Sequence, residues 1–600
     1  MKKYILLLIC LATINISANT ENEARKILDN QQRQLDTEQN RLQQELRKKE
    51  LENTKFDSNS QLNTYTDDLQ LDNSNKFFIA KINIKDEFSL LSNSKKKKIL
   101  KKYLYRELGS NEIKNLLTEL TNTLISDGYI TSIVTLEDGN DLTTGNLNLK
   151  VIEGRIEKIV INNENGLDKF KEFFMFPKNE GDILNIRDLD TATENFNSLQ
   201  SNHFNMEIKA SDLQSHSSIL VTNQLKNKYR IMLTTNNHGE NNQNGIWRYG
   251  ISFNIDSPLG IGDSFFFSYS TVHRKEADRS WKKTLDQLNP GEILPIGPPG
   301  YSPADGDTLP YKRRLDLFNF GYTAKFRDYT LRLASNKNIQ ESSLYSFNTI
   351  YDMKSSSHTL SANLDKILFR NQKSKLTAGI GLKRKHSDNY LETAVLSNRK
   401  LSIGTANITY TTSAYKGLLG ISLGYERGLN WFGAESDENK LDKTPKAQFN
   451  KYTVDINYYK PITQKLTYRF NLSGTYSHDV MYGSERQTIG GVGSVGGFHV
   501  DTVQGDKGIE IGQELSYNIP IGQNLGTVTP YIAYNYGAVK NNRDNSRYAI
   551  GYMTGLTTGL RYSSKFMDFD FGYAKPLTHS EYLNPKKQEM YFSGVLKISF

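Results

Sequence analysis

The sequence predicts a chain in two structural parts: small α+β repeats followed by an all-β transmembrane barrel of about 16 antiparallel strands. Two observations predict this fold class. Apolar residues recur at helical spacing, between strand-like segments, only as far as about residue 228. From residue 229 to residue 600 they alternate with polar residues in segments separated by polar or glycine-rich turns, as in membrane barrels.

The composition agrees with a barrel that has a wet interior. The chain has 600 residues, with 34 Tyr and 28 Phe against 3 Trp, and its mean hydropathy is −0.59. This value excludes a helical membrane bundle, which needs stretches of about 20 apolar residues. It does not exclude a barrel, because barrel strands alternate. The net charge of +9 is small for this length, so we expect no nucleic-acid partner.

Residues 1–18 have the pattern of a secretory signal peptide. Lys2 and Lys3 precede a short apolar run, and small residues follow near Ala18. Lipidation of Cys10 is disfavoured because the bulky Ile9 precedes it. Cys10 is the single cysteine of the chain, so we expect the mature protein to contain neither disulfides nor thiolate metal sites.

A polar helix is predicted over residues 19–57, where Leu28, Leu35 and Leu42 recur every seven residues. This stripe is too narrow to anchor a globular core. The helix is either a weak coiled coil or exposed helix, or a helix that lies in a polar, water-filled space. Residues 58–75 are rich in Asn, Ser and Asp and are predicted to be a linker.

Residues 76–153 are predicted to form one small domain, and residues 154–228 a second copy of it. In the first, the predicted order is a strand from Phe77 to Ile84, two helices and two more strands. The second helix is expected to begin with Ser110 as its N-cap and to end at Gly128. The same β-α-α-β-β order recurs about 75 residues later with little sequence identity.

The strands of residues 229–600 place apolar side chains on one face and polar side chains on the other. In the last strand Met590, Phe592 and Leu596 alternate with Tyr591 and Lys597. Alternation alone does not separate a membrane barrel from a soluble antiparallel sandwich. The barrel is favoured because the chain ends in an aromatic residue on the apolar face, and because a long polar insert, about residues 273–314, fits a surface loop.

Several motifs resemble the outer-membrane transporters of two-partner secretion, a family of the Omp85 superfamily. The run from Gly128 to Val134 and the run from Val151 to Glu157 resemble its first POTRA domain, and the run from Gly181 to Asp190 resembles the second. The matching motif residues are Gly128, Tyr129, Thr131, Glu153, Gly154, Leu184, Arg187 and Asp188. In the barrel, the run from Asp256 to Gly260, the run from Thr529 to Tyr531, and Phe600 match, the last as the expected C-terminal assembly signal.

The resemblance implies a pore in the outer membrane of a Gram-negative-type cell, with its POTRA domains in the periplasm. Its expected partners are a large secreted exoprotein of the adhesin or haemolysin type, outer-membrane lipid and the barrel-assembly machinery. The polar helix at 19–57 would be a plug inside the barrel. The alternative is a protein-insertion or assembly factor of the same superfamily, although such factors usually have more than two POTRA domains and no plug helix.

The glycine-rich run from Gly490 to Phe498 lacks the Lys-Ser/Thr that a phosphate-binding loop requires. By resemblance it is the tip of a loop that folds back into the pore, with Val495, Gly496, Gly497 and Phe498 at the tip. In the family an arginine of the tip pairs with an aspartate of the wall. Here these positions are Gly496 and Asn535, so we interpret them as one paired loss of charge. Arg486 is a second candidate for the missing arginine.

We expect no enzymatic activity, cofactor or metal. No phosphate-binding loop and no zinc-protease motif occurs, and Asp568 and Asp570 are explained by a lumen-facing strand. The basic run from Lys95 to Lys98 is either a solvated helix face or a contact for acidic client segments or lipid headgroups. The first POTRA domain also lacks the cysteine pair of many relatives, so core packing alone must stabilise it.

Overall fold

The structure is a computed structural model that describes most of the chain from residue 75 onward, together with six residues of the predicted N-terminal helix. The described residues are 20–21, 24–25, 28, 51, 75–161, 173–239, 245–274, 312–346, 349–522, 525–542 and 549–600. The predicted signal peptide, most of the linker and most of the insert at about 273–314 lie outside them. Among the described helices none is long and apolar enough to cross a bilayer.

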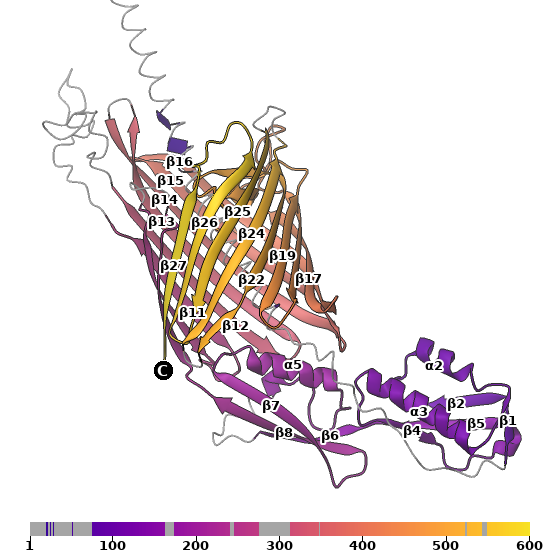
Figure 1. The fold of residues 1–600 in the computed structure, drawn as a ribbon. Helices are drawn as coiled ribbons and strands as arrows, with labels where there is room; N and C mark the ends of the chain where they lie inside the picture. The colour runs from indigo at the N-terminus through magenta and orange to yellow at the C-terminus, as the bar shows by residue number, and fades with distance from the viewer. Residues whose placement is uncertain are drawn as a thin grey trace, which may run out of the picture.

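The first α+β domain lies farthest from the barrel (Figure 1). Its elements are β1 (Phe77–Ile79), β2 (Lys81–Lys85), α2 (Asn93–Leu100), β3 (Arg106–Leu108), α3 (Ser110–Ser126), β4 (Ile133–Leu136) and β5 (Asn146–Ile152). The predicted strand from Phe77 to Ile84 is therefore two strands. β1 pairs with β3, whereas β2 runs parallel to β5 in a sheet of order β2-β5-β4.

Apolar packing between α3 and this sheet forms the core of the domain. Leu116, Leu120 and Leu124 of α3 are fully buried against Leu147 and Leu149 of β5. The predicted N-cap was wrong by one residue: Ser110 is the first helical residue and Gly109 is the N-cap. The amide of Gly109 donates to the Glu112 carboxylate at 3.0 Å, and this contact sets the start of α3.

The second α+β domain lies between the first domain and the barrel. Its elements are β6 (Arg155–Ile161), α5 (Ile186–Asn197), β7 (Asn202–Ala210) and β8 (His216–Leu225). The sheet order is β6-β8-β7, with β6 parallel to β8, which repeats the arrangement of the first domain. Asn185 caps α5 by accepting a hydrogen bond from the Arg187 amide at 2.8 Å.

The described strands beyond residue 228 form a closed antiparallel barrel of sixteen strands, counting β22 and β23 as one strand interrupted at Asn518. They are β9 (Tyr229–Asn236), β10 (Arg248–Asp256), β11 (Ser264–Val272), β12 (Arg314–Phe326), β13 (Tyr329–Ser346), β14 (Thr349–Arg370), β15 (Ser374–Leu391), β16 (Ala394–Ala414), β17 (Gly417–Leu429), β18 (Asn450–Pro461), β19 (Leu466–Tyr476), β22 (Lys507–Tyr517), β23 (Ile519–Gly522), β24 (Gly526–Lys540), β25 (Ile550–Ser563), β26 (Met567–His579) and β27 (Glu589–Ser599). The predicted barrel of about 16 strands is confirmed.

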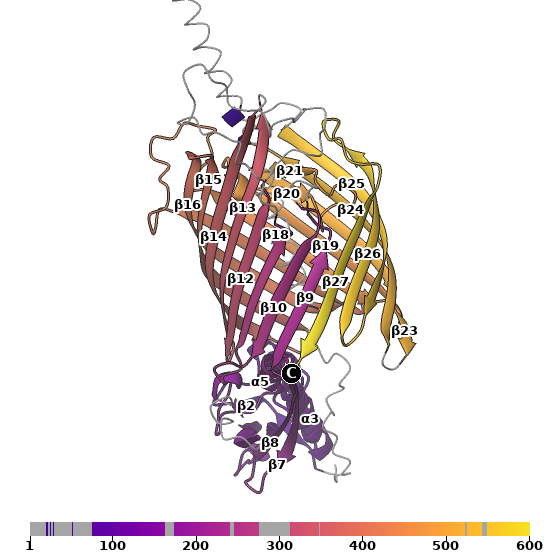
Figure 2. The same ribbon diagram turned by 90° about the vertical axis from the view of Figure 1, so that its left-hand side faces the viewer.

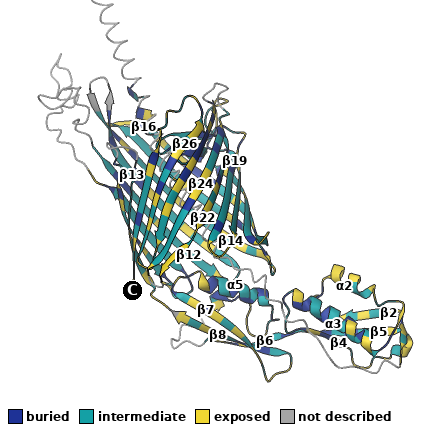
Figure 3. Ribbon diagram, in the orientation of Figure 1, coloured by how far each residue is buried: buried dark blue, intermediate teal, exposed yellow. Residues whose placement is uncertain are grey.

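Period-2 alternation places apolar side chains on the outer surface of the barrel. Met590, Leu596 and Ile598 of β27 are exposed, while Glu589 on the opposite face is buried. Exposed positions recur along the outer strands in Figure 3. This exposure is the lipid-facing arrangement expected for a membrane barrel, because a soluble sandwich would bury the apolar face.

α5 docks on the barrel turns nearest to the second α+β domain. The amide of Arg327, in the turn after β12, donates to the Phe174 carbonyl at 2.6 Å, and the Asn195 side chain donates to the Arg327 carbonyl at 2.8 Å. The Glu194 carboxylate of α5 forms ion pairs with Arg370 and Lys375, each at 2.6 Å. Burial opposes the ionisation of Glu194, but the two cations outweigh it and hold the pKa of this carboxyl well below its usual range.

We predict that Asp188→Asn stabilises the docking of α5 at neutral pH. Burial raises the pKa of Asp188 to about 6, with Lys178 opposing this shift and Asp328 of the barrel reinforcing it. A carboxyl group whose pKa rises on folding destabilises the folded state when it ionises, so stability falls as the pH rises from about 4 to about 6 and stays low above. Asparagine should add about 1–3 kcal/mol at pH 8.

The measurement is limited proteolysis and thermal unfolding of the detergent-solubilised chain at pH 5 and pH 8. The matched control is Asp212→Asn, which alters an exposed turn between β7 and β8. Equal protection of the Asp188→Asn variant and the parent at pH 8 would contradict the prediction.

Candidate functional site

The segment between β19 and β22 folds back into the barrel as a hairpin. Its strands β20 (Gln487–Gly490) and β21 (Thr502–Gly505) pair antiparallel with each other and lie against β24 and β25 (Figure 2). We call the segment 477–506 the pore loop. The lumen is therefore partly filled by a loop that the resemblance had placed there.

The apolar side chains of the loop tip are buried against the barrel wall. Val495 and Phe498 have no exposed surface and pack with Ile489, Val539 and Met553. The Phe498 carbonyl also accepts a hydrogen bond from the Gly491 amide at 2.7 Å, which closes the tip on itself. An ordered tip thus forms without the arginine of the family motif.

The two tip glycines meet the wall through their backbones. A Cβ on Gly555 of β25 would lie 1.9 Å from the Gly496 carbonyl oxygen, and a Cβ on Gly496 would lie 2.1 Å from Thr557 Oγ1. Gly497 has φ +88° and lies so close to Pro576 that a Cβ would come within 2.5 Å of its nitrogen. The tip position 496 has no room for an arginine unless the wall shifts.

Asn535 lies on β24 beside this contact and is the register partner of Gly555. Its amide faces Gly512 of β22, where an added Cβ would lie 3.0 Å from Asn535 Nδ2. Within the described part of the chain, no hydrogen bond joins Asn535 to the tip. Arg486 does not replace the missing arginine either, because its Nε pairs with the fully buried Asp506 at 3.0 Å, at the base of the pore loop.

The polar anchors of the tip come from the last strand, and the sequence reasoning did not find them. The Gly497 amide donates to the Tyr591 hydroxyl at 3.1 Å, and that hydroxyl donates to Glu589 at 2.8 Å. The His499 amide donates to the same Glu589 carboxylate at 2.7 Å. The His499 ring also bonds the Gly239 carbonyl at 2.8 Å, on the far side of the β27–β9 junction. The sequence signal that could have revealed these anchors is Glu589, a glutamate on the polar face of the last predicted strand.

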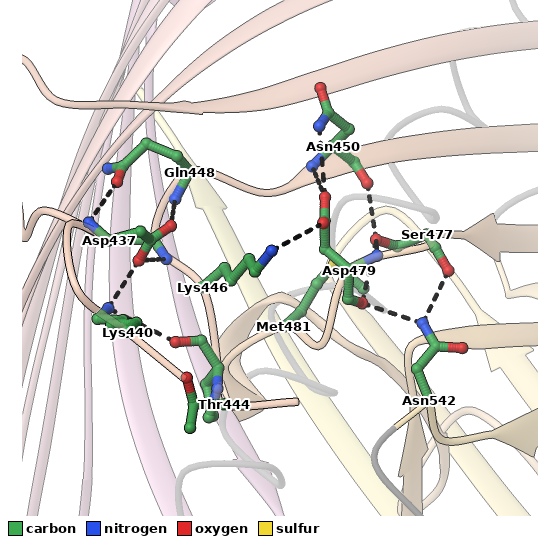
Figure 4. A network of polar contacts seen from close by, with 12 residues as sticks. Asp437, Lys440, Thr444, Lys446, Gln448, Asn450, Ser477, Asp479, Met481 and Asn542 are labelled. Atoms are coloured by element: carbon green, nitrogen blue, oxygen red, sulfur yellow. Dashed lines mark hydrogen bonds and ion pairs between the residues drawn. The ribbon is translucent and has the colours of Figure 1, made fainter. Parts of the chain in front are cut away.

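The base of the pore loop is held by the neighbouring loop of residues 430–449 (Figure 4). In that loop Asp437 accepts the amides of Ala447 and Gln448 at 2.8 and 2.6 Å and the Lys440 ammonium at 2.7 Å. The Lys446 amide donates to the Val480 carbonyl of the pore loop at 2.9 Å. This network braces the base, while the tip is held by β27.

Charged side chains of the inner wall lie below the tip. Arg561 makes two hydrogen bonds to Glu514 at 2.7 and 2.8 Å and one to Asp570 at 3.1 Å, with its guanidinium 3.9 Å from the Tyr531 ring. Asp568 pairs instead with Lys597 at 2.7 Å. Asp570 and Asp568 therefore pair with different cations. In a catalytic carboxylate pair, by contrast, the two carboxyl groups flank one bond that is cleaved.

The N-terminal residues that the structure describes contact both ends of the barrel interior. Leu28 is buried in a cluster with Leu344, Met353 and Leu396, near the ends of the strands farthest from the POTRA domains. Leu51 lies beside Gly420, where an added Cβ would be 3.4 Å from its Cδ1, on the lumen face near the periplasmic end of β17. Leu28 and Leu51 thus place two points of the predicted helix 19–57 against the barrel wall.

The predicted POTRA motif residues gather where the two α+β domains meet. The Gly128 carbonyl, just past α3, accepts the Ile186 amide at 3.0 Å, and the Gly154 carbonyl accepts the Leu184 amide at 2.8 Å. A Cβ on Gly154 would lie 2.0 Å from Thr131 Oγ1. Leu184 is buried in the second core. The junction requires glycine at these close approaches.

The remaining motif residues support or flank this junction. Tyr129 packs on the first core, and Ile130 beside it packs on the second, so one short turn serves both domains. Buried Arg187 donates to Asp190 at 2.9 Å. Asp188 lies within electrostatic range of Asp328 in the turn after β12, and the Glu153 side chain makes no hydrogen bond within the described part of the chain.

The lysines of α2 lie on an exposed face, and α2 buries no side chain. Lys95 pairs with Asp127, and Lys102, just after α2, pairs with Glu119 at 2.9 Å. Exposed lysines suit both interpretations of this run, a solvated helix face or a contact for acidic client segments or lipid headgroups, and both stay predictions.

Comparisons with known proteins follow the same domain order. The family of the haemolysin secretion/activation protein ShlB/FhaC/HecB matches residues 215–562. A ShlB-type POTRA domain matches residues 77–154, and a POTRA domain matches residues 155–210. An outer membrane transporter CdiB of Dickeya dadantii is 29% identical over 489 residues, covering 80% of each chain. The hemolysin transporter protein ShlB of Serratia marcescens is 27% identical, covering 77% of this chain and 76% of that protein.

Two solved structures share the fold. CdiB from Escherichia coli superposes with a TM-score of 0.78 at 22% identity, covering 96% of this chain and 99% of that chain. CdiB from Acinetobacter baumannii gives 0.73 at 20% identity, covering 94% and 99%. At this identity the likeness establishes the fold alone.

A closed 16-strand barrel with a re-entrant loop and two POTRA domains at its periplasmic rim defines an outer-membrane transporter of the Omp85 superfamily. Because the family match covers more than half of the chain, the protein belongs to the ShlB/FhaC/HecB family of haemolysin secretion/activation proteins. It is a two-partner secretion transporter of the outer membrane, as the resemblance implied.

We predict that Gly555→Ala displaces the loop tip and opens the pore. Its new Cβ would lie 1.9 Å from the Gly496 carbonyl oxygen, an overpacking that costs about 1–3 kcal/mol in the docked state. Conductance across planar bilayers should rise. The control is Gly321→Ala in β12, where the nearest atom to a new Cβ is 3.7 Å away. Unchanged conductance in a correctly folded Gly555→Ala barrel would show that the tip does not limit the pore.

Proposed function

We propose that this transporter exports one large exoprotein, of the adhesin or haemolysin type, that reaches its POTRA domains unfolded. The observation that carries the proposal is a closed barrel whose lumen holds a loop attached to the wall by non-covalent contacts, joined to two sheets with open edges. β7 and β4 lie at sheet edges, where an extended polypeptide can add a strand. The curated relatives include proteins named as hemolysin transporters.

The N-terminal helix is the proposed plug of the resting pore. Leu28 and Leu51 touch opposite ends of the lumen, and the 23 steps from one to the other would rise about 35 Å in a helix, enough to span the barrel. A largely polar helix with a sparse leucine stripe suits such a wet channel. We propose that residues 19–57 form this plug and that residues 58–75 are the linker through which it leaves the lumen.

The same proposal sets the domain boundaries and remaining roles. Residues 1–18 would be the signal peptide, 76–153 and 154–228 the POTRA domains, and 229–600 the barrel. Phe600, which stacks on Tyr229 with ring centroids 5.9 Å apart at the closing junction, would be the signal read by the barrel-assembly machinery. Lipid would contact the outer wall. No enzymatic step is proposed; folding of the client outside the cell would give transport its direction.

We predict that deleting the gene removes one large exoprotein from the culture medium and leaves other outer-membrane barrels at normal abundance. Comparative proteomics of medium and outer membrane measures both, and restoring the gene is the control. The alternative function, protein insertion, predicts the opposite pattern, in which many barrels are depleted together.

We predict that fixing the N-terminal segment inside the barrel blocks secretion. Because Cys10 is the single cysteine of the sequence, Leu28→Cys with Met353→Cys introduces a clean thiol pair within one apolar cluster. A short reducible cross-linker should stop export, and reduction should restore it. Each single-cysteine variant is the control. If the cross-linked protein exports its client normally, the plug does not need to leave.

A further inference from the structure

A row of basic side chains follows the strand register across the outer wall of four neighbouring strands. The register pairs Lys337 of β13 with His358 of β14, His358 with His386 of β15, and His386 with Lys400 of β16. Residues directly opposite on neighbouring strands share one face of the sheet. Lys337 and Lys400 are exposed, as are the apolar residues of the outer face, so we call these four residues the outer cationic row.

Arg384 adds a third permanent positive charge, after Lys337 and Lys400, one step below the row. It is exposed and is the register partner of Leu360 on β14. Arg384 lies within electrostatic range of the His358 ring, as do its two neighbours in the row, Lys337 and His386. Lys337, His358, His386 and Arg384 therefore lie close together in space, while Lys400 continues the row by register.

Little negative charge balances this cluster. Within the described part of the chain, the carboxylate that contacts the row is Asp388, 3.3 Å from the His386 ring. No described carboxylate pairs with Lys337, Arg384 or Lys400, although several arginines and lysines of the inner wall do have such partners. Among the described residues the cluster thus carries more positive than negative charge.

An apolar groove lies directly below the row. It has a volume of about 490 Å³ and is lined by Phe320, Leu333, Leu360 and Leu382, with Phe432 of the 430–449 loop beside Arg384. Leu333 and Leu382 both pair with Ala362, whose small side chain leaves the floor of the groove open. An elongated apolar ligand would fit with its polar end against the cations.

The groove and the row meet at the extracellular border of the membrane. On β14 the outward residues between Lys366 and His358 are apolar, namely Leu364, Ala362 and Leu360. The eight steps from Lys366 to His358 rise about 26 Å along the strand, or about 20 Å in height at a tilt of about 40°, against an apolar band of about 25 Å in such barrels.

The row is a local feature of β13–β16. On β17, β18 and β19 the outward residues Tyr425, Tyr452 and Tyr476 pair with one another and form part of an aromatic girdle. Tyr425 pairs on β16 with Ala406, six residues from Lys400, so this girdle does not continue the row.

We propose that this surface binds a phosphate-bearing lipid of the outer leaflet, with its phosphates on the outer cationic row and Arg384 and an acyl chain in the groove below. The charge of the row complements phosphate, and the groove complements a hydrocarbon chain. Phe432 belongs to the loop that braces the base of the pore loop. The bound lipid would therefore support the same loop network from outside.

The test uses the purified full chain in detergent and native mass spectrometry. Phosphorylated lipid A and the same lipid with both phosphates removed are titrated against the parent, Lys337→Ser with Arg384→Ser, and a control. The control, Lys366→Ser with Lys373→Ser, removes two exposed cations at the periplasmic end of β14 and in the turn that follows it. A fourth variant, Leu360→Trp, fills the groove.

The parent and the control should prefer the phosphorylated lipid by about tenfold or more, and the Lys337/Arg384 variant should lose that preference. Leu360→Trp should weaken binding of both lipids. Heat-modifiable migration on gels verifies that each variant is folded. The proposal is overturned if the parent shows no preference, if the Lys337/Arg384 variant keeps it, or if Leu360→Trp binds like the parent.

Discussion

Closure of the barrel between β27 and β9 is the constraint on which the rest of the structure depends. In a bilayer no water satisfies an open strand edge, so the first and last strands must pair along their length. Here Ser599 lies opposite Arg230, and Phe600 exchanges backbone hydrogen bonds with Tyr229. This pairing places the POTRA domains and the C-terminus at the same rim. It also brings the inward-facing residues of β27 to the position where they meet the tip of the pore loop.

The tip of the pore loop is held by main-chain contacts and apolar packing. The tip is held by backbone amides on Tyr591 and Glu589, by the buried Phe498, and by contact between the backbones at Gly496 and Gly555. A buried ion pair stabilises only when both partners are present and well bonded, since removing one leaves a charge without compensation. Glycine at position 496 allows the tip to approach the wall closely, and main-chain amides of Gly497 and His499 hold it there. The interpretation of Gly496 and Asn535 as one paired loss of charge stays a prediction.

The connection from the first POTRA domain to the barrel is a series of short, direct contacts. Gly128 and Gly154 join the two α+β domains through backbone hydrogen bonds, and Arg327 and Glu194 join α5 to the barrel turns. Client binding at a sheet edge would therefore act close to the periplasmic mouth of the pore. The 430–449 loop provides the matching support at the other end, where it braces the base of the pore loop.

The sequence by itself determined the fold class, the repeat of two small domains and the approximate strand number, because helical and period-2 patterns are local and each strand shows its own. It also determined which residues form the loop tip and the POTRA motif, through their resemblance to a family. Tertiary structure alone decided what those residues touch: that Arg486 pairs with Asp506, that Glu589 anchors the tip, and that the POTRA motif is a junction between domains. It likewise aligned Lys337 with Lys400 across four strands. These contacts join residues tens to hundreds of positions apart, and their pairing depends on strand register and barrel closure, which local patterns do not encode.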